Sequence, residues 1–249
     1  MNSGRKTKFG LGGDASFLTT HWTTVLQAAR TGSPETLCAL EKLCVAYWYP
    51  VFVFIRRKGH AQHDAEDLTQ MFFAHVISKD TLKKVDQAKG RFRNFLLASL
   101  TNFLTNEWDK RQTQKRGGTH KIIGFEECSP EELYKNEPVD RFTPERLFER
   151  RWAFVLIDRV VEKLRAEYKS TGKQKLYEKI NSFLTVEAGS AALAQPALEL
   201  DMDEGALKVA IHRLRRRFGV LLRHEVSQTV SSPEEIEAEI RNLMSVIAE

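Results

Sequence analysis

Apolar residues recur every three or four positions along most of the chain, the spacing of one face of an α-helix. In the first half, this pattern predicts helices near residues 22–29, 37–51, 64–78 and 92–111. We expect Pro50 to bend or break the second of these, because proline removes a backbone donor and clashes with the preceding turn. Few segments show the two-residue alternation of a half-buried strand. The sequence therefore predicts an all-α fold.

The helical pattern resumes at Thr143, which is followed by Pro144, as is typical of a helix N-cap with proline at the first helical position. Further helices are predicted near residues 173–184 and 193–200, and a longer one follows Asp203 as its N-cap. The second half of the chain is thus also expected to be helical.

A last amphipathic helix is predicted at the end of the sequence. Ser232 and Glu235 have the spacing of a capping box, and Ile236, Ile240 and Leu243 begin an apolar stripe. We expect this helix to pack back on the domain that precedes it.

These patterns divide the chain into two helical domains joined by a flexible acidic linker. We expect a disordered tail over residues 1–18, a first domain over 19–116, the linker over 117–142, a second domain with a helix-turn-helix over 143–230, and the C-terminal helix over 231–249.

Charge is distributed unevenly along the 249 residues, although the formal net charge is only +5. Residues 89–121 hold eight Lys and Arg against two acids, residues 126–149 hold three against eight, and residues 203–223 hold six against two. Two basic blocks separated by an acidic one favour two sites for a polyanion. The alternative is that these blocks are solvated helix faces.

Several classes of protein are disfavoured. The longest apolar run, residues 45–55, is shorter than the ~20 residues of a membrane helix, and no secretory signal is visible. Cys38, Cys44 and Cys128 have no metal-type spacing and are expected to be reduced thiols. We therefore expect a cytoplasmic protein with no membrane contact.

The sequence also offers little for catalysis. No phosphate-binding loop, nucleophile elbow or Cys with a positioned His is present, so we expect neither enzymatic activity nor a cofactor. His60, His63 and the acids Asp64, Glu66 and Asp67 could converge on a cation. These acids are, however, ordinary first-turn residues that the helix dipole favours, so we expect no metal site.

The second basic block indicates a helix-turn-helix. With Leu207, Ile211 and Leu214 facing a core, the basic residues of the same helix point outward. The short apolar helix at 193–200 and a tight turn at Asp201 precede it. The alternative is a basic amphipathic helix that only packs in a bundle.

The first basic block interleaves aromatic and basic residues, a combination that suits single-stranded nucleic acid. Phe92, Phe95 and Phe103 share the apolar stripe and are expected in the core. Trp108, near the helix end, is the better candidate for stacking on a base.

Three blocks together resemble the extracytoplasmic-function (ECF) group of bacterial RNA polymerase sigma factors, within the sigma-70 family. They are residues 64–70 (DAEDLTQ) followed by Phe72 and Phe73, residues 90–96 (GRFRNFL), and residues 204–217 (EGALKVAIHRLRRR). The resemblance covers roughly residues 19–230, with the blocks in the family's order.

The resemblance implies a region 2 helical bundle followed by a region 4 helix-turn-helix, acting as a transcription initiation factor. Such a factor binds core RNA polymerase, directs it to promoter DNA and helps melt the minus-ten element; an anti-sigma factor is a candidate further partner. Core polymerase would contact Asp64, Glu66, Asp67 and Gln70. The minus-ten element would contact Arg91, Arg93, Asn94, Asn102, Asn106, Trp108, Lys110 and Arg111. The minus-thirty-five element would be read by Lys208, His212, Arg213 and Arg216, with Arg215 and Arg217 on phosphates.

Two positions depart from the family pattern. Pro196 stands where the first helix of the helix-turn-helix usually has an aliphatic residue, and Asp201 stands where the turn usually has Gly. Two other functions remain open: a DNA-binding regulator that uses only the helix-turn-helix, and a helical protein whose basic faces bind acidic proteins.

Overall fold

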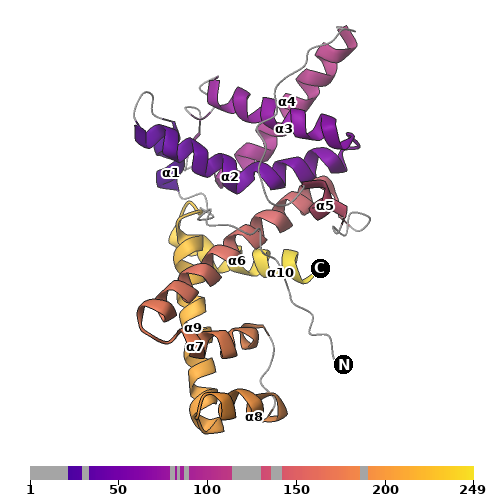
Figure 1. Ribbon diagram of the computed structural model, residues 1–249. Coiled ribbons are helices and arrows are strands. Elements are labelled where there is room, and N and C mark those ends of the chain that lie inside the picture. Colours follow the sequence, from indigo (N-terminus) through magenta and orange to yellow (C-terminus); the bar gives the residue numbers. More distant parts are fainter. Residues whose placement is uncertain are drawn as a thin grey trace.

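The computed structural model describes residues 22–29, 34–78, 82, 85–86, 90–113, 130–135, 142–185 and 190–249 (Figure 1). Within these ranges the chain is helical and has no strand, so the predicted all-α class is confirmed. The elements are α1 (Trp22–Ala28), α2 (Pro34–Arg57), α3 (Gln62–Ser78), α4 (Phe92–Thr113), α5 (Pro130–Lys135), α6 (Pro144–Ser170), α7 (Gln174–Ile180), the 3-10 helix η4 (Asn181–Leu184), α8 (Ser190–Glu199), α9 (Glu204–Ser227), the 3-10 helix η5 (Pro233–Glu235) and α10 (Ile236–Ala248). The predicted tail over 1–18 and most of the predicted linker over 117–142 lie outside the described residues.

Helix α2 is the centre of the upper part of the molecule, where α1, α3 and α6 pack on it (Figure 1). Pro50 was expected to bend or break this helix, and it does not break it, since α2 is continuous from Pro34 to Arg57. Proline in a helix interior costs about 3 kcal/mol. Here all five residues that follow it, 51–55, are buried, and each buried apolar side chain contributes about 1.5–3 kcal/mol. Burial thus outweighs the cost of the proline.

Helix α2 is also long and apolar enough to cross a membrane by length and composition alone. Most of its apolar stretch is buried inside the protein, as in the core helix of a soluble protein. The helix therefore gives only weak support for a membrane span.

Aromatic contacts join the helices of the upper part. The ring of Tyr47 lies 5.6 Å from that of Phe92 and 6.2 Å from that of Phe148, which links α2 to both α4 and α6. The rings of Phe72 and Phe103 lie 5.6 Å apart between α3 and α4. Phe92 and Phe103 are buried, as their place on the apolar stripe predicted.

Helix α6 connects the upper and lower parts of the molecule (Figure 1). It packs on α2 and also on α9 and α10. Its predicted cap is present, because the Thr143 side chain accepts a hydrogen bond of 3.2 Å from the backbone N–H of Arg146. Buried residues from Val25 to Leu243 form one hydrophobic cluster. The described residues thus share a core, and the division into two domains stays a prediction.

Part of the predicted flexible linker forms a helix that packs on the rest of the protein. Helix α5 lies on α2, where the Arg56 guanidinium donates to both carboxylate oxygens of Glu131 at 2.8 and 2.7 Å. The same guanidinium lies 4.8 Å from the ring centre of Tyr134. These contacts fix residues 130–135 beside the end of α2.

Helix α10 packs on α6 and α9 through buried Leu243 and Val246, as predicted for the C-terminal helix. The predicted capping box is wrong in its details. The Ser232 side chain makes no capping hydrogen bond, and the 3-10 turn η5 precedes the α-helix. The Glu235 carboxylate instead accepts a hydrogen bond of 3.4 Å from the backbone N–H of Ser231.

Candidate nucleic-acid interface

Helix α8 and the start of α9 lie at the foot of the molecule in Figure 1. These two helices and the turn between them are the segment for which the sequence predicted a helix-turn-helix. The two helices pack together, with Leu193 and Ala197 buried on α8 and Leu207 and Ile211 buried on α9. Apolar spacing of three and four on both helices therefore produces the pair.

The turn depends on two aspartates. Asp201 has a φ of 51°, the left-handed conformation that Asp tolerates better than most residues. Asp203 then caps α9, since its Oδ1 accepts a hydrogen bond of 2.8 Å from the backbone N–H of Ala206. Pro196 lies inside α8 without ending it, and the helix runs from Ser190 to Glu199. Neither departure from the family pattern prevents the turn.

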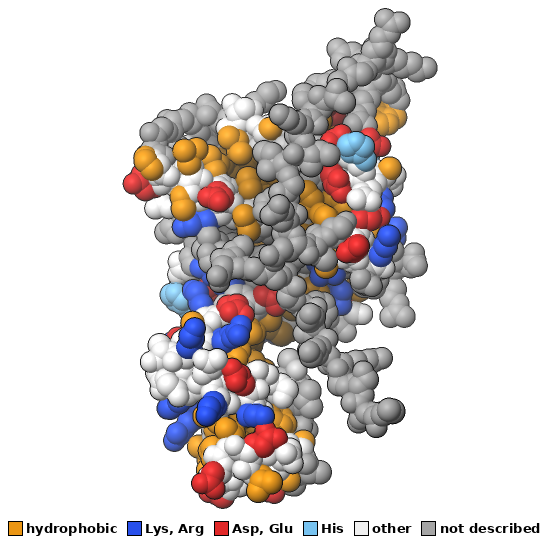
Figure 2. Space-filling view, viewed as in Figure 1, with side chains coloured by type: hydrophobic (Ala, Val, Ile, Leu, Met, Phe, Trp, Pro, Cys, Tyr) orange, Lys and Arg blue, Asp and Glu red, His pale blue; other side chains and the backbone are white. Residues whose placement is uncertain are grey.

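One face of α9 exposes basic side chains along the first turns of the helix. Lys208, His212, Arg213 and Arg216 are all exposed. Val209, 48% exposed, lies among them. Figure 2 shows Lys and Arg side chains gathered over the lower part of the molecule. The face thus combines positive charge with an exposed apolar side chain, and both kinds of group are used in contacts to the major groove of duplex DNA.

The two predicted phosphate contacts of α9, Arg215 and Arg217, make hydrogen bonds within the protein instead. The Arg215 Nε donates to the Phe183 carbonyl oxygen at 2.9 Å. The guanidinium of Arg217 donates to both carboxylate oxygens of Glu167 at 2.7 and 2.5 Å. The hydrogen bonds from Arg217 lower the pKa of Glu167. These arginines therefore fasten α9 to its neighbours in this conformation.

The start of α4 differs most from the sequence-based assignment. Arg93, only 2% exposed, and Arg91 were placed in the minus-ten site, but both pair with Glu239 of α10. The Arg91 guanidinium is 2.8 Å from one Glu239 oxygen, and Arg93 pairs with the other. The Arg93 guanidinium also lies 4.4 Å from the ring centre of Trp152. In this conformation Arg93 is inaccessible to DNA.

The remaining minus-ten candidates lie farther along α4. Asn94, Asn102 and Asn106 are exposed, and Trp108 is 60% exposed. The side chains of Lys110 and Arg111 lie outside the described residues.

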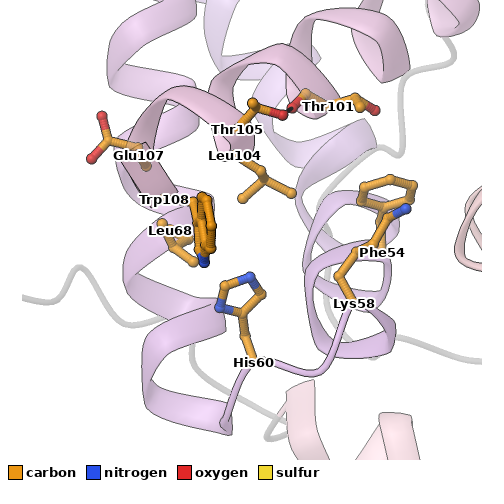
Figure 3. Close-up of a pocket in the computed structure, with 9 residues that line it drawn as sticks. All are labelled: Phe54, Lys58, His60, Leu68, Thr101, Leu104, Thr105, Glu107 and Trp108. Carbon is orange, nitrogen blue, oxygen red and sulfur yellow. Dashed lines mark hydrogen bonds between the residues drawn. The ribbon is translucent and has the colours of Figure 1, made fainter. Parts of the chain in front are cut away.

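Beside Trp108 is an open cavity of about 340 Å³ between α2, α3 and α4 (Figure 3). Its wall is largely apolar, with Phe54, Leu68 and Leu104, and His60 faces the Trp108 ring across it. A cavity of this size and lining suits a planar aromatic group. The arrangement can therefore accommodate an unstacked base.

The predicted polymerase-binding residues lie together on the first turns of α3. Asp64 is exposed, and Glu66, Asp67 and Gln70 are half-buried. Glu66 Oε1 accepts a hydrogen bond of 3.0 Å from the Gln62 side chain. Over the part of the chain that the structure describes, no three His, Cys, Asp or Glu side chains are grouped to hold a metal ion.

Comparisons with family models, with curated proteins and with solved structures found no match for this chain.

No role was assigned to Glu239 or Val209 from the sequence, and His60 was considered only as a metal ligand. The structure places Glu239 against the two arginines at the start of α4, Val209 on the exposed face of α9, and His60 in the wall of the cavity. A signal existed for Glu239, because it lies within the apolar stripe of α10, three residues after Ile236 and four before Leu243. An acid on the apolar face of a helix predicts a buried ion pair.

Proposed function

We propose that this protein is a transcription initiation factor of the sigma type. It binds core RNA polymerase, directs the enzyme to promoters and helps melt the minus-ten element. In this proposal α1–α4 form the region 2 part and α6–α9 the region 4 part. Core polymerase carries the catalytic centre, and the chain acts in the cytoplasm without a cofactor.

The observation that carries the proposal is the α8–α9 pair with the exposed basic face of α9. A recognition helix enters the major groove with its N-terminal residues and contacts base edges there. Lys208, His212 and Arg213 lie on the first three turns of α9 and are exposed for this role. Arg and Lys donate to guanine acceptors, and Val209 can contact a thymine methyl group.

The α4 surface supports strand capture. Trp108 stands at the mouth of the apolar cavity, with exposed Asn102 and Asn106 on the same helix. Stacking of a base on an aromatic side chain is worth about 1–3 kcal/mol. That gain offsets the base stacking lost when the duplex opens, so the surface favours the melted strand.

Polymerase recruitment is tested by co-purification with core RNA polymerase and by transcription from a promoter library. Asp64→Lys and Asp67→Lys reverse charge at the start of α3 and should weaken the complex. The matched control is Glu178→Lys on α7, an exposed acid away from this surface. A complex that is absent, or equally weakened by the control, would count against the proposal.

A regulator that uses only the helix-turn-helix is the second candidate, favoured by the pairing of Arg91 and Arg93 with Glu239. Duplex binding without polymerase separates the two. Arg213→Ala and Arg216→Ala should each reduce the salt slope by about one unit if the side chain contacts a phosphate. Arg165→Ala, exposed on α6, is the control. Tight sequence-specific duplex binding without any polymerase complex would favour the regulator.

A further inference from the structure

Glu239 is fully buried although it belongs to a helix on the protein surface. Its two carboxylate oxygens pair with Arg91 and Arg93, which come from the start of α4, far away in the sequence. Helix α10 thus contacts α6 and α9 mainly through apolar residues, with one surface ion pair between Glu237 and Arg223, and it contacts the start of α4 through the Glu239 carboxylate. The charge contact therefore ties the C-terminal helix to the start of α4, in addition to the packing of α6 on α2.

The ion pair is close but poorly aligned. Among the described groups, neither Arg93 Nε nor the two Glu239 oxygens has a hydrogen-bond partner of good geometry, although the charges are in contact. Buried charges are costly unless hydrogen bonds satisfy them. The carboxylate therefore satisfies the two guanidinium groups only in part.

The same pair of guanidinium groups can also bind a phosphate. Arginine binds phosphate oxygens in the same forked manner as carboxylate oxygens. Arg91, whose side chain is 25% exposed, gives the site an edge that reaches solvent. The helical spacing puts the exposed residues Asn94, Thr101 and Trp108 on one side of α4, and Arg91 directly precedes the helix. A strand lying along this side would extend from Arg91 at the start of the helix to Trp108 near its end, and it would reach Arg93 only after α10 moves away.

We propose that α10 is an autoinhibitory clasp, in which Glu239 occupies the Arg91 and Arg93 site until a phosphate of single-stranded nucleic acid replaces it. The identity of the anion rests on the proposed function, whereas the clasp itself rests on the contacts of α10. In the closed state the strand-binding side of α4 lacks its two innermost cations. Opening of α10 supplies them.

The test uses the full-length protein without polymerase and a labelled single-stranded oligonucleotide. Glu239→Gln removes the charge that holds the arginines, so the open fraction rises and the apparent Kd falls in proportion. We expect at least about tenfold tighter binding. Adding Arg91→Gln to this variant should return the affinity toward the wild-type value, because the released cation is then missing.

The matched control is Glu237→Gln on the same helix, whose carboxylate pairs with Arg223 at the surface at 2.7 Å. It should bind the oligonucleotide like the wild type. Amide hydrogen exchange provides the structural readout: residues 236–248 should exchange faster in Glu239→Gln and at the wild-type rate in the control.

A second variant guards against misfolding. Leu243→Ala loosens α10 through its apolar contact, leaves every charge in place, and should also tighten oligonucleotide binding. If neither Glu239→Gln nor Leu243→Ala changes the affinity, or if the gain survives loss of Arg91, the clasp is refuted.

The initiation role is judged separately, by transcription of the wild type with core polymerase. An oligonucleotide gain without transcription would keep the clasp and refute initiation. Transcription by the wild type, without tighter oligonucleotide binding by Glu239→Gln, would support the initiation role and refute the clasp.

Discussion

Glu225 of α9 joins this helix to α6 through two ion pairs. It is fully buried and pairs with Arg159 Nε at 3.0 Å and with the Lys163 ammonium, both on α6. Burial lowers the pKa of Arg159, and Glu225 opposes that shift. Glu225→Gln would therefore leave two cations of α6 without their shared counter-charge.

The magnitude follows from the exposure of the two cations. Removing one partner of a buried ion pair costs about 3–5 kcal/mol. The Lys163 side chain is 37% exposed and can turn into solvent, whereas the Arg159 side chain is only 11% exposed and cannot. Because only the Arg159 charge would stay buried without Glu225, we expect the free energy of unfolding to fall by about 3 kcal/mol, the lower end of that range. For a chain of this size that lowers Tm by roughly 6–12 °C.

Urea unfolding followed by circular dichroism measures the loss directly. The control Glu237→Gln removes an exposed pair with Arg223 and should cost less than about 1 kcal/mol. Replacing both Glu225 and Arg159 by Leu should recover most of the loss, because an apolar pair carries no desolvation cost. A Glu225→Gln loss no larger than that of the control would refute the argument.

Three further predictions concern other sites. Burial raises the pKa of Asp158 to about 6, with a neighbouring glutamate adding to the shift. The fold is therefore destabilised progressively as the pH rises from about 4 to about 6, because the carboxyl ionises first in the unfolded chain, and the penalty stays constant at higher pH. Asp158→Asn should stabilise the protein by on the order of 1 kcal/mol near neutral pH but not near pH 4, as measured by urea unfolding. Burial likewise raises the pKa of the Cys44 thiol to about 11, so in a Cys128→Ser background iodoacetamide should modify exposed Cys38 much faster than Cys44, as read by mass spectrometry. Asp203→Ala removes the cap of α9 and should lower thermal stability by about 1 kcal/mol and weaken duplex DNA binding.

Each of these has an outcome that contradicts it. Equal gains for Asp158→Asn at both pH values would show that the effect is not the ionisation. Similar modification rates for Cys38 and Cys44 would show that Cys44 is accessible. If Asp203→Ala left DNA binding unchanged, the start of α9 would not be the part of the helix that reads DNA.

Local patterns predicted much of the fold. The caps at Thr143 and Asp203 and the helix after each were correct, because an N-cap depends on residues within one turn. Apolar spacing also placed Phe92 and Phe103 in the core. These features need no knowledge of distant parts of the chain.

Apart from the local capping box at Ser232, the differences from the structure involve contacts between distant segments. Pro50 was expected to bend or break α2, and the burial of the residues after it explains why the helix is not broken. Helix α5 was assigned to a linker because its partner Arg56 lies 75 residues earlier. Arg93 was expected at the surface, since basic residues are usually solvated and its partner Glu239 lies at the other end of the chain. Periodicity does not reveal such pairings.

Helix α6 also sets the angle about its own axis at which α9 stands relative to α2. Its 27 residues pack on α2 near the start and on α9 farther along, and each residue of an α-helix adds about 100° of rotation and 1.5 Å of length. One residue inserted between Ala153 and Val160 would turn α8 and α9 by about 100° about the α6 axis, whereas seven, close to two full turns, would nearly restore the angle. Changes in the length of this segment are therefore compatible with both packing surfaces only in steps near whole helical turns.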